Sequence, residues 1–97
     1  MNEIKFACVR CKRKGDSDYV YTVGLNHTQC YESLTFAYDM YPTVDPHLYD
    51  CEEGFLLKDE TFVDRYDAMK IAKETDQLLP SYKHTESLQL FSYMIWG

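Results

Sequence analysis

The fold is decided by residues 54–77, which read GFLLKDETFVDRYDAMKIAKETDQ. The apolar run at 54–58 predicts a buried strand. Asp59 and Glu60 supply a polar turn, and residues 61–63 return as a few strand residues. A short hairpin is therefore predicted immediately before a helix.

The helix is predicted from Asp64, whose carboxylate can accept the backbone N–H groups that a first helical turn leaves unpaired. Apolar residues then recur with the 3.6-residue period of one helix face, at Ala68, Ile71, Ala72, Thr75 and Leu79. We expect Pro80 to end this helix, because its ring excludes helical geometry from the residue before it.

A second hairpin and helix are predicted upstream. Residues 4–12 form a strand that is apolar on both faces, with Ile4, Phe6 and Cys8 on one and Ala7, Val9 and Cys11 on the other. Such a strand is covered on both sides, by packing or by a partner subunit. Residues 19–23 are β-branched and aromatic, as in the second strand of a hairpin. The capping-box spacing of Asn26 and Gln29 opens a helix, with an apolar stripe of Cys30, Leu34, Ala37, Tyr38 and Tyr41.

The remaining segments complete the layout. Residues 42–51 contain two prolines and predict an irregular connection, and residues 88–96 predict a final strand. The predicted order is strand, strand, helix, strand, strand, helix, strand. We therefore expect an α+β fold of two layers, with an antiparallel or mixed sheet of about five short strands and two helices on one face. A chain of 97 residues forms a single domain, residues 1–97.

The composition is that of an ordinary globular protein, with 45% hydrophobic and 15% aromatic residues. No apolar run has the length of a membrane span, and residues 1–5 lack the apolar core of a signal peptide. We therefore expect a reducing cytosol, in which all four cysteines are thiols.

The formal charge of −6 argues against general nucleic-acid binding by long-range attraction. Half of the Lys and Arg residues nevertheless fall in the first 14 positions, namely Lys5, Arg10, Lys12, Arg13 and Lys14. They are either the lysine-rich surface of an edge strand or a patch that faces phosphate. The first interpretation is favoured, because no aromatic residues alternate with these cations along the chain.

One Cys–Cys pair and one His–Cys pair could together form a metal site. The spacings Cys8-x-x-Cys11 and His27-x-x-Cys30 supply three thiols and an imidazole, which is a known structural zinc set. On a continuous strand, however, Cys8 and Cys11 point to opposite faces. The alternative is that the cysteines are buried as small apolar residues.

No catalytic constellation is predicted. Cys30 and His27 are three residues apart on the expected helix, but no acid near them orients the imidazole. His47 and His84 lie in polar segments, and there is no Gly-rich phosphate loop. The sequence thus predicts neither an enzyme nor a cofactor.

The two helix beginnings are better candidates for a site. Asn26 and His27 open the first helix, and Asp64 and Arg65 open the second. The free N–H groups and the positive end of the helix dipole make such termini anion sites, which an adjacent Arg or His reinforces.

Arg65, Phe62 and Tyr66 can each be interpreted in two ways. Arg65 either binds an anion or pairs with Asp67 or Glu60 at the surface. Phe62 and Tyr66 either stack on a base or fill the core, and core packing suits Phe62 better.

Several of these motifs resemble a pattern of small phage proteins, in which a Gly-Phe strand precedes an Arg-Phe-Val-Asp/Asn-Arg segment and an Arg-His pair opens the upstream helix. The matching positions are Gly54, Phe55, Phe62, Val63, Asp64, Arg65, Ala68, Ala72, Gln77, His27 and 90–92. The chain is thereby similar to the first Thoeris anti-defence family of phage sponge proteins. The resemblance implies a small α/β protein that assembles as homodimers or higher homo-oligomers, with ligand pockets between subunits.

The function implied by the resemblance is sequestration, without cleavage, of a cyclic nucleotide or cyclic ADP-ribose signal in the cytoplasm of the infected bacterial host. The implied ligand-binding residues are Asn26, His27, Thr61, Phe62, Arg65 and Tyr66. Asn26 and Thr61 stand where the family pattern has arginines.

Two alternatives remain. The acidic charge and the two changed arginine positions favour an acidic phage inhibitor that binds a host defence protein directly, such as a CRISPR or other nuclease effector. The third candidate is a structural module stabilised by zinc.

Overall fold

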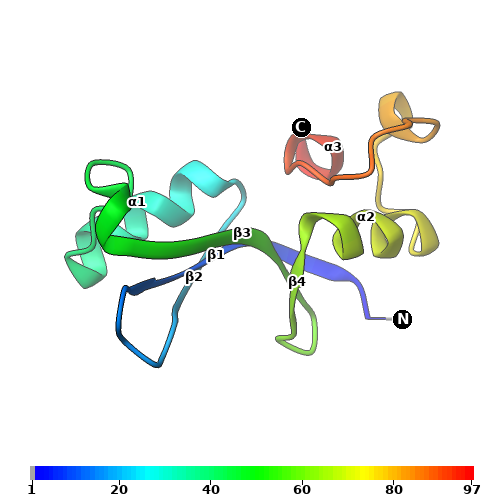
Figure 1. Ribbon diagram of the computed structural model, residues 1–97. Helices are drawn as coiled ribbons and strands as arrows, with labels where there is room; N and C mark the ends of the chain where they lie inside the picture. The colour runs from blue at the N-terminus through cyan, green and yellow to red at the C-terminus, as the bar shows by residue number, and fades with distance from the viewer. Residues whose placement is uncertain (1) are drawn as a thin grey trace.

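A twisted sheet with helices packed on one side forms the framework of the chain (Figure 1). The computed structural model describes residues 2–97. The elements are β1 (Ile4–Arg13), β2 (Val20–Gly24), α1 (His27–Tyr38), η1 (Pro46–Leu48), β3 (Tyr49–Leu57), β4 (Phe62–Asp64), α2 (Arg65–Glu74), η2 (Pro80–Tyr82) and α3 (Tyr93–Trp96). Strand order is β2-β1-β3-β4, and every neighbouring pair is antiparallel. The predicted α+β fold is confirmed, with four strands in the sheet.

Both longer helices cover the same face of the sheet. Strand residues Ala7, Val9 and Phe55 are fully buried on this face. They share one core cluster with Cys30 and Leu34 of α1 and Ala68, Met69 and Ala72 of α2. Figure 1 shows α1 over one end of the sheet and α2 over the other, and the chain is elongated, measuring 39 × 23 × 21 Å.

The sheet face predicted for Ile4 of β1 is wrong. A register shift between Ile4 and Phe6 inserts Lys5 as an extra residue, so Ile4 joins Ala7 on the core face. Such a bulge breaks the strict alternation that the sequence pattern assumed.

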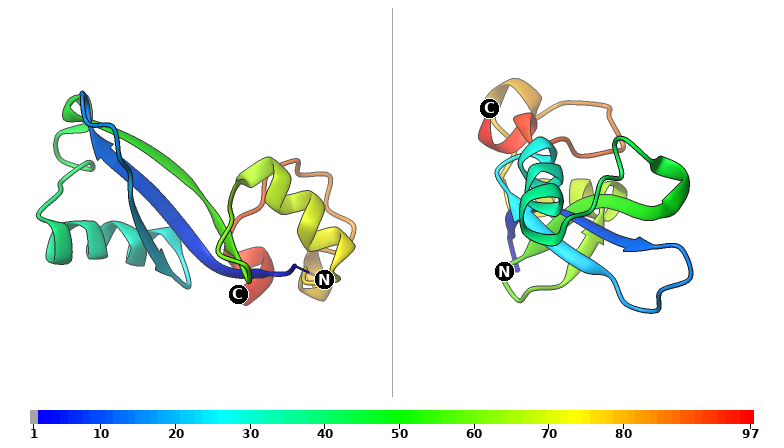
Figure 2. Two further views of the ribbon diagram at one scale, coloured as in Figure 1. Left: turned by 90° about the horizontal axis from the view of Figure 1, so that it is seen from below. Right: turned by 90° about the vertical axis from the view of Figure 1, so that its left-hand side faces the viewer.

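The opposite side of the sheet, called here the open face, is not covered by any helix of residues 2–97 (Figure 2). The register places on it Phe6, Cys8, Arg10, Tyr21, Val23, Leu56 and Phe62. Tyr21 and Val23 are exposed there, whereas Cys8 is fully buried.

The predicted helix starts are confirmed by their caps. The Asn26 side chain accepts the Gln29 N–H at 2.9 Å, and the Gln29 carboxamide oxygen accepts the Leu25 N–H at 2.9 Å. The Asp64 carboxylate accepts the Asp67 N–H at 2.8 Å. In each case a local side chain satisfies a donor that the first turn leaves free.

Both helices end earlier than predicted, because aspartates adopt the left-handed conformation. The α2 helix stops at Glu74, well before Pro80. Asp76 has φ +56°, and the Gln77 N–H donates to the Ala72 carbonyl at 2.9 Å, which is the bond of a Schellman motif. The α1 helix stops at Tyr38 because Asp39 has φ +54°, and its predicted stripe is buried only at Cys30 and Leu34.

The predicted C-terminal strand is wrong. Residues 93–96 form the short helix α3 instead. The adjacent residues Met94 and Ile95 are both buried, which a strand with one exposed face would not allow. The Leu90 N–H donates to the Arg65 carbonyl at 2.9 Å, so this segment runs along the start of α2.

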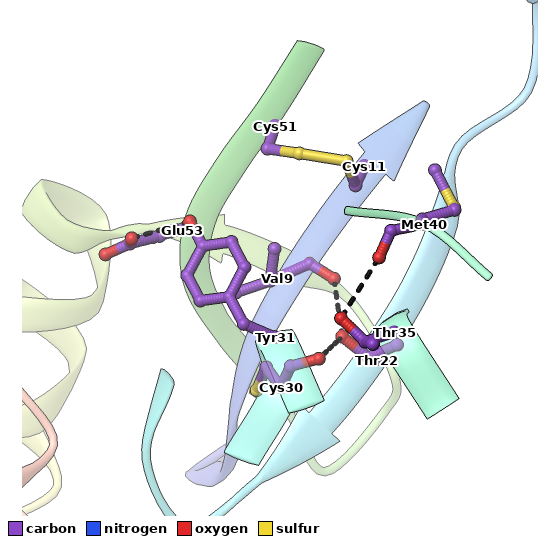
Figure 3. Close-up of a disulfide and its surroundings, with 9 residues drawn as sticks. All are labelled: Val9, Cys11, Thr22, Cys30, Tyr31, Thr35, Met40, Cys51 and Glu53. Carbon is purple, nitrogen blue, oxygen red and sulfur yellow. Dashed lines mark hydrogen bonds between the residues drawn. A yellow bond between two sulfur atoms is a disulfide. The ribbon is translucent and has the colours of Figure 1, made fainter. Parts of the chain in front are cut away.

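The prediction of four thiols is also wrong. Strand β3 begins at Tyr49, earlier than expected, and its register sets Cys51 directly opposite Cys11 with Cα atoms 4.1 Å apart. The two sulfurs form a disulfide (Figure 3). The sequence pattern missed this pairing because it placed Cys51 in an irregular connection. Cys8 and Cys30 are free and buried.

Within residues 2–97, no helix combines the length and the apolar character needed to cross a membrane.

Candidate functional site

The two helix beginnings meet over the middle of β3 (Figure 1). Helix α1 begins at His27 and α2 at Arg65. An Arg65 guanidinium nitrogen lies 3.4 Å from Nδ1 of His27. These two predicted site residues are therefore neighbours within one chain, whereas the prediction brought them together across a subunit contact.

Glu53 of β3 lies between the helix starts and occupies the position that an anion would take. Its carboxylate pairs with the Arg65 guanidinium and accepts a hydrogen bond from the Tyr31 hydroxyl at 2.7 Å. Figure 3 shows Tyr31 reaching from α1 toward Glu53. We refer to His27, Tyr31, Glu53 and Arg65 as the Glu53 cluster.

The other strong donors of the Glu53 cluster are engaged by the backbone. Nε2 of His27 donates to the Gly54 carbonyl at 2.8 Å, which leaves Nδ1 as an acceptor for Arg65. A second guanidinium nitrogen of Arg65 donates to the Leu90 carbonyl at 2.8 Å, and the guanidinium carbon lies 4.6 Å from the centre of the Phe91 ring. The cluster therefore joins both helices and the C-terminal segment to β3.

The protonation states follow from burial and these partners. Burial lowers the pKa of His27, and the Arg65 charge lowers it further, so the imidazole is neutral at pH 7. Burial alone would raise the pKa of Glu53, but the Tyr31 hydroxyl and Arg65 outweigh it and the net shift is downward. Burial and then Glu53 raise the pKa of Tyr31. The cluster thus holds one ionised pair, Glu53 with Arg65.

The other predicted site residues lie elsewhere. Asn26 caps α1, and Thr61 is exposed in the turn before β4. Phe62 lies on the open face with its ring centre 6.1 Å from that of Tyr21, and Tyr66 is 50% exposed on the outer side of α2. The six residues therefore do not line one pocket.

The zinc interpretation lacks its ligands. Cys11 is bonded to Cys51, and Cys8 lies on the opposite face of β1. No group of three His, Cys, Asp or Glu residues within 2–97 is placed to hold a metal. Burial is the largest cause that raises the pKa of Cys8 to about 12 and that of Cys30 to about 11, so both remain thiols at neutral pH.

The basic N-terminal residues also differ from their prediction. Strand β1 lies inside the sheet, not at its edge. The guanidinium of Arg10 lies 4.8 Å from the Tyr19 ring and 4.6 Å from the Phe62 ring, and it pairs with Glu52 at 2.7 Å. Aromatic residues thus surround this cation, but they come from neighbouring segments that the linear pattern did not reveal.

Sequence reasoning missed Glu53 and Tyr31, although one signal was present. Residue 53 has the same parity as Phe55 and Leu57, so its side chain emerges on the core face. A carboxylate at such a position requires a cationic or hydroxyl partner. The signal was lost because the predicted strand began only at Gly54.

A second candidate surface is the acidic face, which we define as α1 and residues 39–50. The chain has no Lys or Arg from residue 15 to 57, but it has eight Asp and Glu there. The acids of the acidic face are exposed, at Glu32, Asp39, Asp45 and Asp50. Arg13 borders this face, where it donates to the Asp39 carbonyl at 3.2 Å.

The acidic face also has two hollows and exposed apolar side chains. A hollow of about 310 Å³ is lined by Thr28, Tyr31, Glu32, Thr35, Phe36 and Thr43. A second hollow of about 250 Å³ adjoins it, because Tyr31 and Thr43 line both. Phe36 is 86% exposed and Val44 72% exposed. Exposed apolar side chains beside a hollow, bordered by acids, are typical of a protein-binding surface.

A family model described as Phage T4 y16D protein matches residues 3–96. The chain belongs to this phage family. The match covers every residue of the sheet and helices described above, so it applies to the whole fold. The description of the y16D family states a phage origin and does not state a ligand or an activity. No curated protein and no solved structure matches the chain. The resemblance to Thoeris anti-defence sponges stays a prediction.

Proposed function

We propose that this member of the y16D family is a non-enzymatic protein that binds a basic protein of the bacterial host through its acidic face. The observation that carries the proposal is Phe36, which is 86% exposed beside the hollow that Glu32 lines. An exposed aromatic side chain is the usual anchor of a protein interface. Acidic side chains around Phe36 that have no cationic partner within residues 2–97 favour a basic protein and increase its association rate.

The Glu53 cluster has a structural role in this proposal. The side chains of His27, Tyr31 and Arg65 each have an internal partner, and these contacts hold the two helix starts on β3. The proposed place of action is the host cytoplasm, where a small acidic protein meets basic nucleic-acid enzymes. Inhibition of a host defence nuclease is the form of this function that the charge favours.

The proposal is tested by reversing two exposed acids. Wild-type protein and the double variant Glu32→Lys with Asp45→Lys are immobilised and exposed to host extract. A retained protein is identified, purified and titrated against both chains. We expect a basic partner whose affinity falls at least tenfold in the variant and falls steeply with salt, as for exposed charges.

The matched control is the double variant Glu74→Lys with Glu86→Lys, which makes the same charge change on exposed residues outside the acidic face. It should leave the affinity within about twofold of wild type, whereas Phe36→Ala should weaken binding about tenfold. A partner that binds wild type and the double variant equally would refute the acidic face as its docking site.

A second candidate, sequestration of a cyclic nucleotide or cyclic ADP-ribose signal, is favoured by one observation. His27 and Arg65 lie 3.4 Å apart at two helix starts, where an anion is stabilised. An incoming phosphate would have to displace Glu53 from Arg65. We propose that such binding would occur in a homodimer or higher homo-oligomer, in which a second copy contributes to the pocket.

This candidate is tested on protein purified from a host that makes immune signals. The protein is denatured and the released small molecules are identified by mass spectrometry. Sequestration predicts an intact cyclic nucleotide and a rise in the melting temperature when it is added back. It also predicts an oligomer by light scattering. A protein that releases no nucleotide and shows no thermal shift would exclude it.

A further inference from the structure

A hollow of about 240 Å³ lies between α2 and the C-terminal segment. It is lined by Tyr66, Met69, Lys70, Lys73, Ser87 and Leu88. Met69 is buried and forms the floor, whereas Tyr66 is 50% and Leu88 74% exposed. We refer to this feature as the α2 groove. It lies on a different element from the acidic face and shares no residue with it.

Among the described residues, the α2 groove is lined by two lysines and by no acidic residue. Lys70 and Lys73 are one turn apart on α2, and neither belongs to an ion pair within residues 2–97. Like charges at this spacing repel one another. An anion bound between them would remove that repulsion and gain attraction from both.

The groove continues past Lys73 into a second hollow of about 180 Å³. Lys83 and His84 line this extension together with Asp76. Lys83 is compensated by Asp76 at 3.5 Å, so the uncompensated positive charge is concentrated at Lys70 and Lys73. An anionic group is therefore expected at the junction of the two hollows.

The apolar walls define the rest of the ligand. The Tyr66 ring and the Leu88 side chain are exposed on the two sides of the hollow. Aromatic and aliphatic walls favour a flat or apolar body, and polar groups at the rim fix its orientation. From these residues we infer that the α2 groove binds a small organic anion, a phosphate or carboxylate that carries an aromatic group.

The experiment titrates the ¹⁵N-labelled full chain with four probes and follows its amide resonances. Adenosine monophosphate is an aromatic phosphate, and 2-naphthoate is an aromatic carboxylate. Adenosine lacks the charge, and inorganic phosphate lacks the aromatic group. We expect at least one aromatic anion to shift α2 and residues 83–88 with saturation, at least tenfold more tightly than adenosine or phosphate. Adenosine monophosphate alone would identify a nucleotide-type ligand, and naphthoate alone an aromatic carboxylate.

Variants tie the binding to the groove. Lys70→Gln and Lys73→Gln should each weaken the bound anion about tenfold, because each removes one charged contact. Lys58→Gln removes another exposed lysine, which lies outside the groove, and should change the affinity less than twofold. Saturable shifts at other sites, equal binding by the lysine variants, or no binding by either anion would overturn the inference. None of these outcomes depends on the acidic face, whose Glu32→Lys variant should bind the anion as wild type does.

Discussion

Glu53→Gln tests whether the ion pair between the two helix starts is structural. The glutamine keeps an acceptor for the Tyr31 hydroxyl but removes the charge that compensates Arg65. Arg65 is 15% and Glu53 37% exposed. Breaking a buried pair costs about 3–5 kcal/mol and an exposed one about 0.2–1 kcal/mol. The partial exposure of Glu53 sets the expected loss at about 2 kcal/mol in the free energy of unfolding.

The assay is urea unfolding at pH 7, followed by circular dichroism, with a thermal scan beside it. For a domain of this size the loss corresponds to a fall of about 8–16 °C in melting temperature. The matched control is Glu3→Gln, which breaks the exposed pair with Lys58 and should cost less than about 1 kcal/mol. If Glu53→Gln costs no more than Glu3→Gln, the cluster does not hold the helix starts together.

Further predictions concern protons, cysteines and backbone packing. Folding lowers the pKa of His27 below its unfolded value of 6.5. The contribution of neutral His27 to the free energy of unfolding is therefore complete above pH 6.5 and is lost as the pH falls below that value. The melting temperature of His27→Gln should therefore fall less between pH 6.5 and 5 than that of wild type. Reduction of the Cys11–Cys51 disulfide, which closes a separation of 40 residues, should cost about 4 kcal/mol in urea unfolding. Cys8 and Cys30 should react with iodoacetamide only after unfolding, as mass spectrometry would show. Gly54→Ala should unfold at a lower urea concentration, because a Cβ there would clash with the Val63 carbonyl oxygen.

Local chemistry was sufficient to predict where helices start, but not where they end. Asn26 and Asp64 cap α1 and α2 as expected, because a cap involves only the following turn. The helix ends were misplaced because Asp39 and Asp76 have left-handed backbone conformations, whereas the apolar pattern continues past both residues. The apolar run before Trp96 was ambiguous, since a short run fits strand or helix until its packing on the core decides.

The candidate site was predicted in part for the same reason. His27 and Arg65 were found from the helix starts, but Glu53 was missed because its role depends on the strand register that turns it toward them. The disulfide partner of Cys11 depends on that register as well. Neither relation is visible in the spacing of residues along the chain.

The disulfide between β1 and β3 encloses the whole acidic face, since α1 and residues 39–50 lie between Cys11 and Cys51. A protease that cuts once within this loop would leave two fragments still covalently joined. The nicked product would keep its mass on a non-reducing gel, apart from one added water, and would separate into two bands only after reductant. Damage to the exposed loop would thus leave the sheet attached to both parts of the chain.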